Sequence, residues 1–195
     1  MNEKTSETMN QQIANHISKD DIVSILDRNT VWIENCDSKA SIMLGFLGVL
    51  FTVFFVSDFI EKVFILILTL IKTNALLAAT FIIVIILSIC AIAIGCFFLA
   101  KVLYARTSLT GSTSSQPKLS LIFFTDIAKR KSISDYKSDM LSCCEDELIN
   151  DLISQIYICA AICDKKFGLY KKGVMFSLLG FASFLLTTLL LIVFL

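Results

Sequence analysis

Long runs of apolar residues without any charged side chain dominate the pattern of this chain. Three of them cover residues 40–57, 73–100 and 174–195, with 18, 28 and 22 residues. A helix needs about 20 consecutive apolar residues to cross the hydrocarbon core of a bilayer. Because this core offers no hydrogen-bond partners to free backbone amides, each run is predicted to be a helix. The pattern therefore predicts three membrane-spanning helices.

A fourth apolar run, Val63–Ile71, has only nine residues and is bounded by Lys62 and Lys72. Nine residues of helix extend about 14 Å, which is too short to cross a membrane. Residues 58–72 are therefore predicted to form a short external loop. We interpret its apolar run as an interfacial segment, and a re-entrant segment or an extension of a helix beyond the membrane face remain as alternatives.

The polar N-terminal region has two parts. Residues 1–19 are rich in Ser, Thr, Asn and Gln and are expected to be a disordered tail. From Asp20 onward apolar residues recur at helical spacing, and the acidic residues there suit a helix start. Residues 20–39 are predicted to form an amphipathic helix that leads directly into the first span, since no Pro or Gly intervenes before Gly45.

The middle region, residues 101–173, is predicted to combine a linker with a mainly helical stalk. Thr107–Pro117 (TSLTGSTSSQP) has the composition of a linker, and Leu119–Ala128 fits either a strand or a buried helical turn. Ser142 and Glu145 have the spacing of a capping box at the start of a helix. The helix ahead of the first span is the expected partner of the apolar stripe that follows. This stripe consists of Leu148, Leu152, Ile156, Cys159, Cys163, Phe167 and Tyr170.

Composition and charge narrow the class of protein. Of the 195 residues, 56% are hydrophobic and 17% are charged, whereas a typical soluble domain has about 25% charged residues. The 17 basic residues balance 17 acidic ones, so the formal net charge is zero. These values exclude an ordinary soluble enzyme, a disordered chain and a protein that binds a nucleic-acid polymer through net basicity.

The distribution of positive charge predicts the orientation of the spans. Fifteen of the 17 Lys and Arg residues lie in residues 1–39 and 101–173, and two lie in residues 58–72. By the positive-inside rule, the N-terminus and residues 101–173 are expected in the cytoplasm. The predicted fold is an all-α membrane protein with three transmembrane helices and a mainly helical cytoplasmic stalk between spans 2 and 3.

The residues that usually carry catalysis or bind metals are sparse. The single histidine, His16, lies in the N-terminal tail, and no catalytic or phosphate-loop motif occurs. The seven cysteines have neither metal-ligand spacing nor the arrangement of a disulfide framework. We therefore expect no enzyme, no metal site and no bound cofactor.

A basic cluster in the stalk has two interpretations. Lys129, Arg130 and Lys131 are consecutive, with Tyr136 close behind. They fit a patch that faces anionic lipid headgroups, or an anion pocket for a phosphorylated ligand, with Phe123, Phe124 or Tyr136 stacking on a base. Asp126 fits a helix cap, an ion partner of the cluster or a ribose contact. The candidate ligand-binding residues are Phe124, Asp126, Lys129, Arg130, Lys131 and Tyr136.

Small residues occur four apart within the predicted spans. The pairs are Ser41 with Gly45, Ala91 with Gly95, and Gly173 with Ser177. Such pairs allow close helix packing, although small residues are common in any membrane helix. No ionisable side chain of the Asp, Glu, Lys, Arg or His type lies within a span, which argues against a proton-coupled transporter and a voltage sensor.

Three local patterns together resemble a known family. The first is Trp32-Ile33-Glu34 followed by Asp37-Ser38-Lys39-Ala40-Ser41, and the second is Phe123–Ala128 with Tyr136. The third is Asp151–Tyr157 ahead of Lys165-Lys166-Phe167. The chain resembles the Pycsar effector (PycTM-like) transmembrane family of bacterial anti-phage systems over residues 27–195.

The resemblance implies a function that composition cannot supply. In that family a neighbouring cyclase makes cyclic CMP or cyclic UMP after infection, and the effector damages the inner membrane so that the cell dies before phage spreads. It implies a multi-pass protein of the bacterial inner membrane, activated by a cyclic nucleotide. We expect the ligand to bind in the stalk between protomers of a homo-oligomer. The alternatives are a structural oligomeric membrane subunit, a holin-like constitutive pore former, and an effector that answers a cyclic oligonucleotide.

Overall fold

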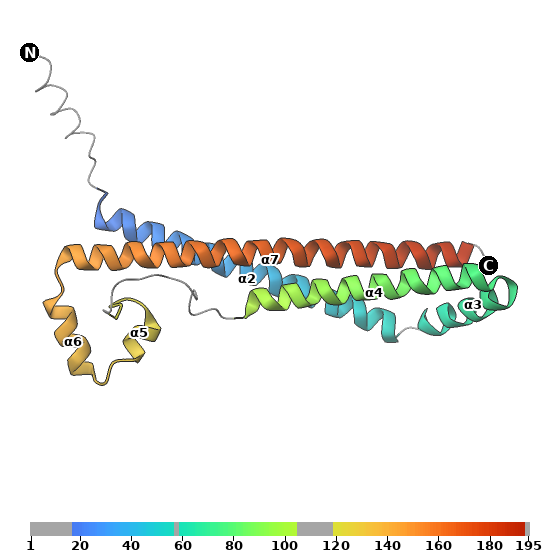
Figure 1. Ribbon diagram of the computed structural model, residues 1–195, viewed down its shortest axis with the longest axis horizontal. Coiled ribbons are helices and arrows are strands. Elements are labelled where there is room, and N and C mark those ends of the chain that lie inside the picture. The colour runs from blue at the N-terminus through green and yellow to red at the C-terminus, as the bar shows by residue number, and fades with distance from the viewer. Residues whose placement is uncertain (1–16, 57–58, 105–118, 194–195) are drawn as a thin grey trace, which may run out of the picture. The chain divides into compact units, whose positions relative to one another are not determined.

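The computed structural model describes residues 17–56, 59–104 and 119–193, and all regular structure within them is helical. The predicted all-α membrane fold is confirmed. The linker 107–117 and nearly all of the predicted tail lie outside the described residues. The helices, labelled in Figure 1, are α2 (Lys19–Val56), α3 (Phe59–Thr73), α4 (Ala75–Leu103), α5 (Phe124–Ala128), α6 (Ile133–Ser142) and α7 (Glu145–Val193).

Three of these helices, α2, α4 and α7, are long and apolar enough to cross a membrane. Helix α2 has 38 residues and runs without a break from the amphipathic stretch into the first apolar run. Its start is fixed by Ser18 and Asp21, since each backbone amide donates to the other residue's side chain, at 3.0 and 3.1 Å. This reciprocal cap satisfies amides that the first helical turn leaves free.

The apolar run in residues 58–72 belongs to a helix of its own. Helix α3 has 15 residues, about 22 Å at the rise of an α-helix, which is shorter than a hydrocarbon core of about 30 Å. Asn74 separates it from α4, where its side chain accepts a hydrogen bond from the amide of Leu77 at 3.2 Å. Leu70 of α3 is buried with Ala78 and Leu191.

Two expectations for residues 119–145 need revision or completion. Only Phe124–Ala128 of the segment 119–128 is helical. The capping-box interpretation of Ser142 is wrong, because Ser142 is the last residue of α6 and its hydroxyl donates to the carbonyl of Asp139. Helix α7 continues through Gly168 and Gly173 as one helix of 49 residues, so a glycine within it does not separate the stalk from the third span.

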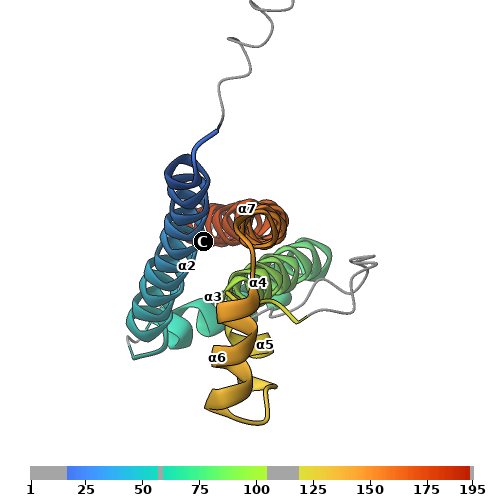
Figure 2. The same ribbon diagram turned by 90° about the vertical axis from the view of Figure 1, so that its left-hand side faces the viewer.

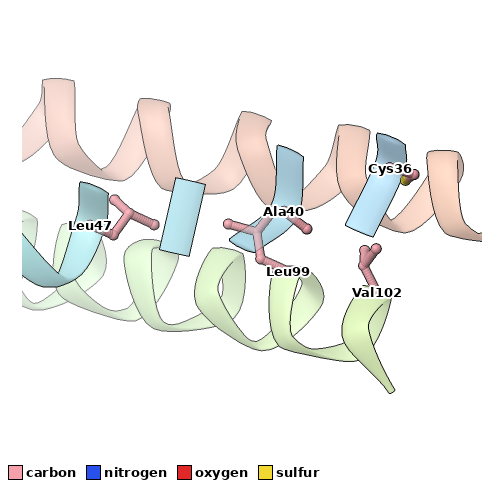
Figure 3. Packing of buried hydrophobic residues seen from close by; sticks show 5 residues of the cluster. All are labelled: Cys36, Ala40, Leu47, Leu99 and Val102. Carbon is pink, nitrogen blue, oxygen red and sulfur yellow. The ribbon is translucent and has the colours of Figure 1, made fainter. Parts of the chain in front are cut away.

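The described residues divide into two compact units. The first combines residues up to Val31 with Thr107–Ala161, and the second combines Trp32–Arg106 with Ile162–Leu195. In the second unit, Cys36, Ala40 and Leu47 of α2 form a buried cluster with Leu99 and Val102 of α4, and Figure 3 shows the α2 and α4 side chains facing one another. Phe167, Tyr170 and Val174 of α7 pack against this cluster.

Helices α4 and α7 lie side by side in the second unit (Figures 1 and 2) and meet through glycines. A Cβ placed on Gly95 would lie 2.6 Å from the amide nitrogen of Ser177, and one on Gly180 would lie 2.8 Å from the carbonyl oxygen of Ser88. The Ser88 and Ser183 hydroxyls are hydrogen-bonded across the seam at 2.9 Å. Of the predicted small-residue pairs, Gly95, Gly173 and Ser177 thus contribute to this seam, whereas a Cβ on Gly45 would meet nothing within 4 Å.

Candidate functional site

In the first unit, a short non-helical segment is bound to α7 through Asp151. The Asp151 carboxylate accepts hydrogen bonds from the Ser120 hydroxyl at 2.9 Å and from the Leu121 amide at 2.8 Å. The buried side chain of Gln155, one turn further along α7, donates to the Ser120 hydroxyl at 3.4 Å. Leu121 is 5% exposed. Polar contacts and apolar burial therefore fix the segment ahead of α5 on α7.

Arg130 and Tyr136 hold this segment to the short helices. The Arg130 guanidinium pairs with Asp139 and donates to the carbonyls of Leu119 and Ser120 at 3.2 and 3.3 Å. It lies 5.2 Å from the centre of the Tyr136 ring, whose hydroxyl donates to the Leu121 carbonyl at 3.0 Å. The Arg130 side chain is 5% exposed, so it makes its hydrogen bonds inside the unit. Helices α5 and α6 of this unit are labelled in Figure 2.

Asp126 also makes contacts within the unit. Its carboxylate accepts from the Lys129 ammonium at 2.8 Å and from the Ser120 amide at 3.3 Å. The Lys129 hydrogen bond holds the pKa of the Asp126 carboxyl below its usual value, aided by the Ser120 amide and opposed by partial burial. Asp126 is therefore an ion partner of the basic cluster, as one of the sequence interpretations expected.

The remaining candidates are on the surface of the unit. The Lys129 side chain is 64% exposed although it pairs with Asp126, and Lys131 is exposed. The Phe124 ring is 62% exposed and lies 5.1 Å from the Phe123 ring. The six predicted residues thus share one unit but have two kinds of environment: Arg130, Tyr136 and Asp126 bind the unit together, whereas Phe124, Lys129 and Lys131 offer cations and an aromatic face to solvent.

Replacing Lys129 with methionine is expected to raise the pKa of the Asp126 carboxyl toward its ordinary value. A carboxyl whose pKa is lowered in the folded state stabilises that state above its ordinary pKa, and this contribution is lost as pH falls through the folded-state pKa. The Asp126–Ser120 contact should therefore be lost at a higher pH in the variant than in the wild type. A carbon-13 titration of the labelled aspartate carboxyls measures this shift, and an unchanged Asp126 titration would contradict it.

A second polar contact, in the second unit, joins α2 to α7. The Lys166 ammonium lies 2.5 and 2.7 Å from the two Asp37 carboxylate oxygens, with side chains 10% and 36% exposed. Near it the Trp32 and Phe167 rings meet edge to face, 6.4 Å apart. All four residues belong to the patterns on which the family resemblance was based, but sequence reasoning assigned them no contact.

An apolar cavity of about 240 Å³ lies within the second unit. Side chains of α2, α3, α4 and α7 line it, and the aromatic rings of Phe54, Phe181 and Phe184 form part of its wall through edge contacts at 5.7–5.8 Å. The full lining is Leu47, Leu50, Phe51, Phe54, Ile60, Val63, Ile85, Ile89, Ile92, Phe181 and Phe184.

Within the described residues, no group of three or more His, Cys, Asp or Glu side chains is placed to hold a metal ion.

Comparison with known proteins relates this arrangement to a family. The family model described as the Pycsar effector protein domain (PycTM) matches residues 21–194. The Pycsar effector protein GmPycTM of Gulbenkiania mobilis is 31% identical over 166 residues, which cover 80% of this chain and 84% of that protein. No solved structure matches the chain. Since the family match extends from the start of α2 to the end of α7, this chain belongs to the Pycsar effector (PycTM) family of membrane proteins.

Proposed function

We propose that this protein is a cyclic-nucleotide-activated effector of an anti-phage abortive-infection system, which disrupts the inner membrane when it senses cyclic CMP or cyclic UMP. The observation that carries the proposal is the match to the Pycsar effector family over residues 21–194. This range contains all three candidate membrane helices and the polar unit between the second and third of them. The membrane-disrupting part and the sensing part would therefore belong to one chain.

The exposed side of the first unit suits an anionic ligand with an aromatic base. Lys129 and Lys131 can donate charge-assisted hydrogen bonds to a phosphate, and the Phe124 face can stack on a base. Arg130 and Tyr136 support this surface from within rather than contacting the ligand. One surface offers too few contacts to enclose a nucleotide, so we place the ligand between the surfaces of two protomers in a homo-oligomer.

Activation then requires differential binding. A ligand shifts a two-state equilibrium only by the difference between its affinities for the two states. Moving a protein from about 1% to about 99% active requires roughly 5.5 kcal/mol. Several sites in an oligomer, each adding a few charge-assisted contacts, would supply this difference. A cyclase would provide the ligand, and no catalysis, metal or cofactor in this chain is needed.

The membrane topology is part of the proposal. Residues 1–39 and 101–173 carry 15 of the 17 basic residues, which supports a cytoplasmic position for both by the positive-inside rule. The ligand-binding surface would then face the compartment in which a cyclase works. Protease treatment of right-side-out and inverted membrane vesicles tests this orientation, because cleavage in residues 107–117 should occur only in inverted vesicles.

Dye release from liposomes that contain the full-length protein tests the function. We expect release with cyclic CMP or cyclic UMP and none with cyclic AMP. Since a hydrogen bond to a charged group contributes about 1.5–3 kcal/mol, changing Lys129 and Lys131 to glutamine should raise the nucleotide concentration needed at least about tenfold. Lys137→Gln, which removes another exposed cation of the same unit, is the matched control and should leave the response unchanged.

The same measurement separates the alternatives. Release without any nucleotide would replace the proposal with a constitutive pore former, and release only with a cyclic oligonucleotide would assign a different signal. A protein that inserts correctly but never releases dye would be a structural membrane subunit.

A further inference from the structure

The second unit combines one tightly packed helix pair with one less tightly packed helix. Helices α4 and α7 approach so closely at Gly95 and Gly180 that added Cβ atoms would lie within 3 Å of backbone atoms of the facing helix. Glycine seams of this kind bring helix backbones into direct contact, and the packing is then insensitive to side-chain rearrangement. We therefore treat α4 and the C-terminal part of α7 as one rigid pair.

Helix α2 packs against this pair differently. Its glycines take no part in the contact, since a Cβ on Gly45 or Gly48 would meet nothing within 4 Å. Leu47, Leu50 and Phe54 of α2 instead line the apolar cavity of about 240 Å³, opposite side chains of α4 and α7. A cavity deprives the surrounding side chains of dispersion contacts and gives them space to rearrange. The apolar half of α2 therefore has space beside it in which to shift against α4 and α7.

The opposite end of this α2 segment is held by the Asp37–Lys166 ion pair. Cys36, beside Asp37, is fully buried, and the edge contact of Trp32 with Phe167 lies one turn further along α2. Ion pairs differ from apolar packing because both partners regain hydration when they separate. The net stabilisation by such a pair is small, but removing one partner leaves the other charge unpaired in a poorly hydrated place. With Lys166 only 10% exposed, the pair favours one position of α2 without making that position permanent.

We infer that the segment Trp32–Val56 of α2 moves against the rigid α4–α7 pair, and that the Asp37–Lys166 ion pair is the latch that keeps it in the closed position. The latch is defined by contacts of the second unit alone. The consequence of its release, a breach in the membrane, rests on the proposed function. Space beside the apolar half of α2 and a separable contact at its polar end together allow the helix to tilt or rotate as a body.

Alkylation of Cys36 measures the position of α2 directly. We use the full-length protein in liposomes, with Cys90, Cys96, Cys143, Cys144, Cys159 and Cys163 changed to serine, so that the buried Cys36 reports opening. Asp37→Asn and Lys166→Gln are each expected to increase the rate of maleimide labelling about tenfold or more without nucleotide, because the population of the open position rises as the latch is lost. The exchanged pair Asp37→Lys with Lys166→Asp should return labelling toward the original rate.

Matched controls come from the neighbouring positions. Glu34→Gln and Lys165→Gln remove one exposed charge each from the same two helices and should leave Cys36 labelling unchanged. Equal labelling rates in Asp37→Asn and the parent protein would overturn the latch, as would an exchanged pair that labels as fast as the single variants. Should one of the two single-substitution variants fail to fold, the other one, compared with the parent and with the exchanged pair, still decides the question.

Dye release from the same liposomes keeps the two proposals apart. Faster labelling together with nucleotide-independent release supports both the latch and membrane disruption. Faster labelling without release supports the latch and counts against membrane disruption by this chain. Unchanged labelling with normal nucleotide-dependent release overturns the latch and leaves the proposed function intact.

Discussion

Replacing Gly95 with leucine is expected to cause the largest loss of stability of any single substitution considered for this protein. A Cβ at this position would lie 2.6 Å from the Ser177 amide nitrogen and 2.9 Å from the Gly173 carbonyl oxygen. Both atoms belong to the backbone of α7, so no side-chain rotation can make room and the two helices must separate. Overpacking of a close-packed interface costs about 1–3 kcal/mol, and we expect the upper end of this range.

Thermal unfolding in detergent micelles, followed by circular dichroism, measures the effect. Gly45→Leu is the matched control because it makes the same change on α2 at a position where an added Cβ meets nothing within 4 Å. We expect a clear fall of the midpoint temperature for Gly95→Leu and little change for Gly45→Leu. Equal midpoints for the two variants would show that the glycine seam is not the main contact between α4 and α7.

The second large effect is expected for Arg130→Met, in the first unit. The variant keeps a long apolar side chain near Tyr136 but loses the ion pair with Asp139 and the hydrogen bonds to the carbonyls of Leu119 and Ser120. Hydrogen bonds to charged groups contribute about 1.5–3 kcal/mol each, although contributions within one network do not add. We expect a local loss of about 2–3 kcal/mol, with the segment ahead of α5 released from Arg130 and from α6 while its contacts with Asp151 remain.

Hydrogen exchange followed by mass spectrometry localises this loss, since it reports protection peptide by peptide. Peptides that cover residues 119–142 should exchange faster in Arg130→Met, whereas peptides of α4 should not change. Lys131→Met removes the adjacent exposed charge and should leave all peptides unchanged. Faster exchange in Lys131→Met than in Arg130→Met would reverse the roles that the structure assigns to the two residues.

The contrast between Arg130 and Lys131 matters for any study of nucleotide sensing. Adjacent cations look equivalent in the sequence, and both were predicted to bind a ligand. An Arg130 variant that loses the nucleotide response would not identify a ligand contact, because the same substitution also removes contacts that hold together the unit with the exposed surface. Lys129 and Lys131 variants are the informative ones, since both side chains are exposed and, of the two, Lys129 pairs with Asp126.

The positions of the membrane helices could be predicted because the bilayer imposes a condition that is local in sequence. A span must be about 20 residues long and free of charge, so residues 73–100 and 174–195 could be assigned without knowing what packs against them. The start of α2 near Asp20 followed from helical spacing in the same way. The 15-residue helix α3 could not be assigned, because a nine-residue apolar run fits an interfacial segment, a re-entrant segment or a helix extension.

The contacts between these elements depend on residues far apart in the chain. Asp37 and Lys166 are separated by 129 positions, and no periodicity links them, since an ion pair leaves no pattern in either local sequence. No sequence pattern links Ser120 to Asp151 either, although the two side chains are hydrogen-bonded. Nor does any pattern indicate that the Arg130 side chain lies inside the unit. The family resemblance drew attention to Trp32, Asp37 and Lys166, because all three belong to the patterns that carry it. It did not indicate that Asp37 and Lys166 form an ion pair.

A three-span helical membrane protein with a polar region between the second and third spans could be inferred from the order of residues alone, because burial in lipid requires an apolar composition in each segment separately. Which glycines bring α4 and α7 together, which cations face inward, and that Asp37 of α2 pairs with Lys166 of α7 became clear only from the tertiary structure. Each of those features depends on how two surfaces pack against each other. The order of residue types indicates the character of each surface but not which other surface it contacts.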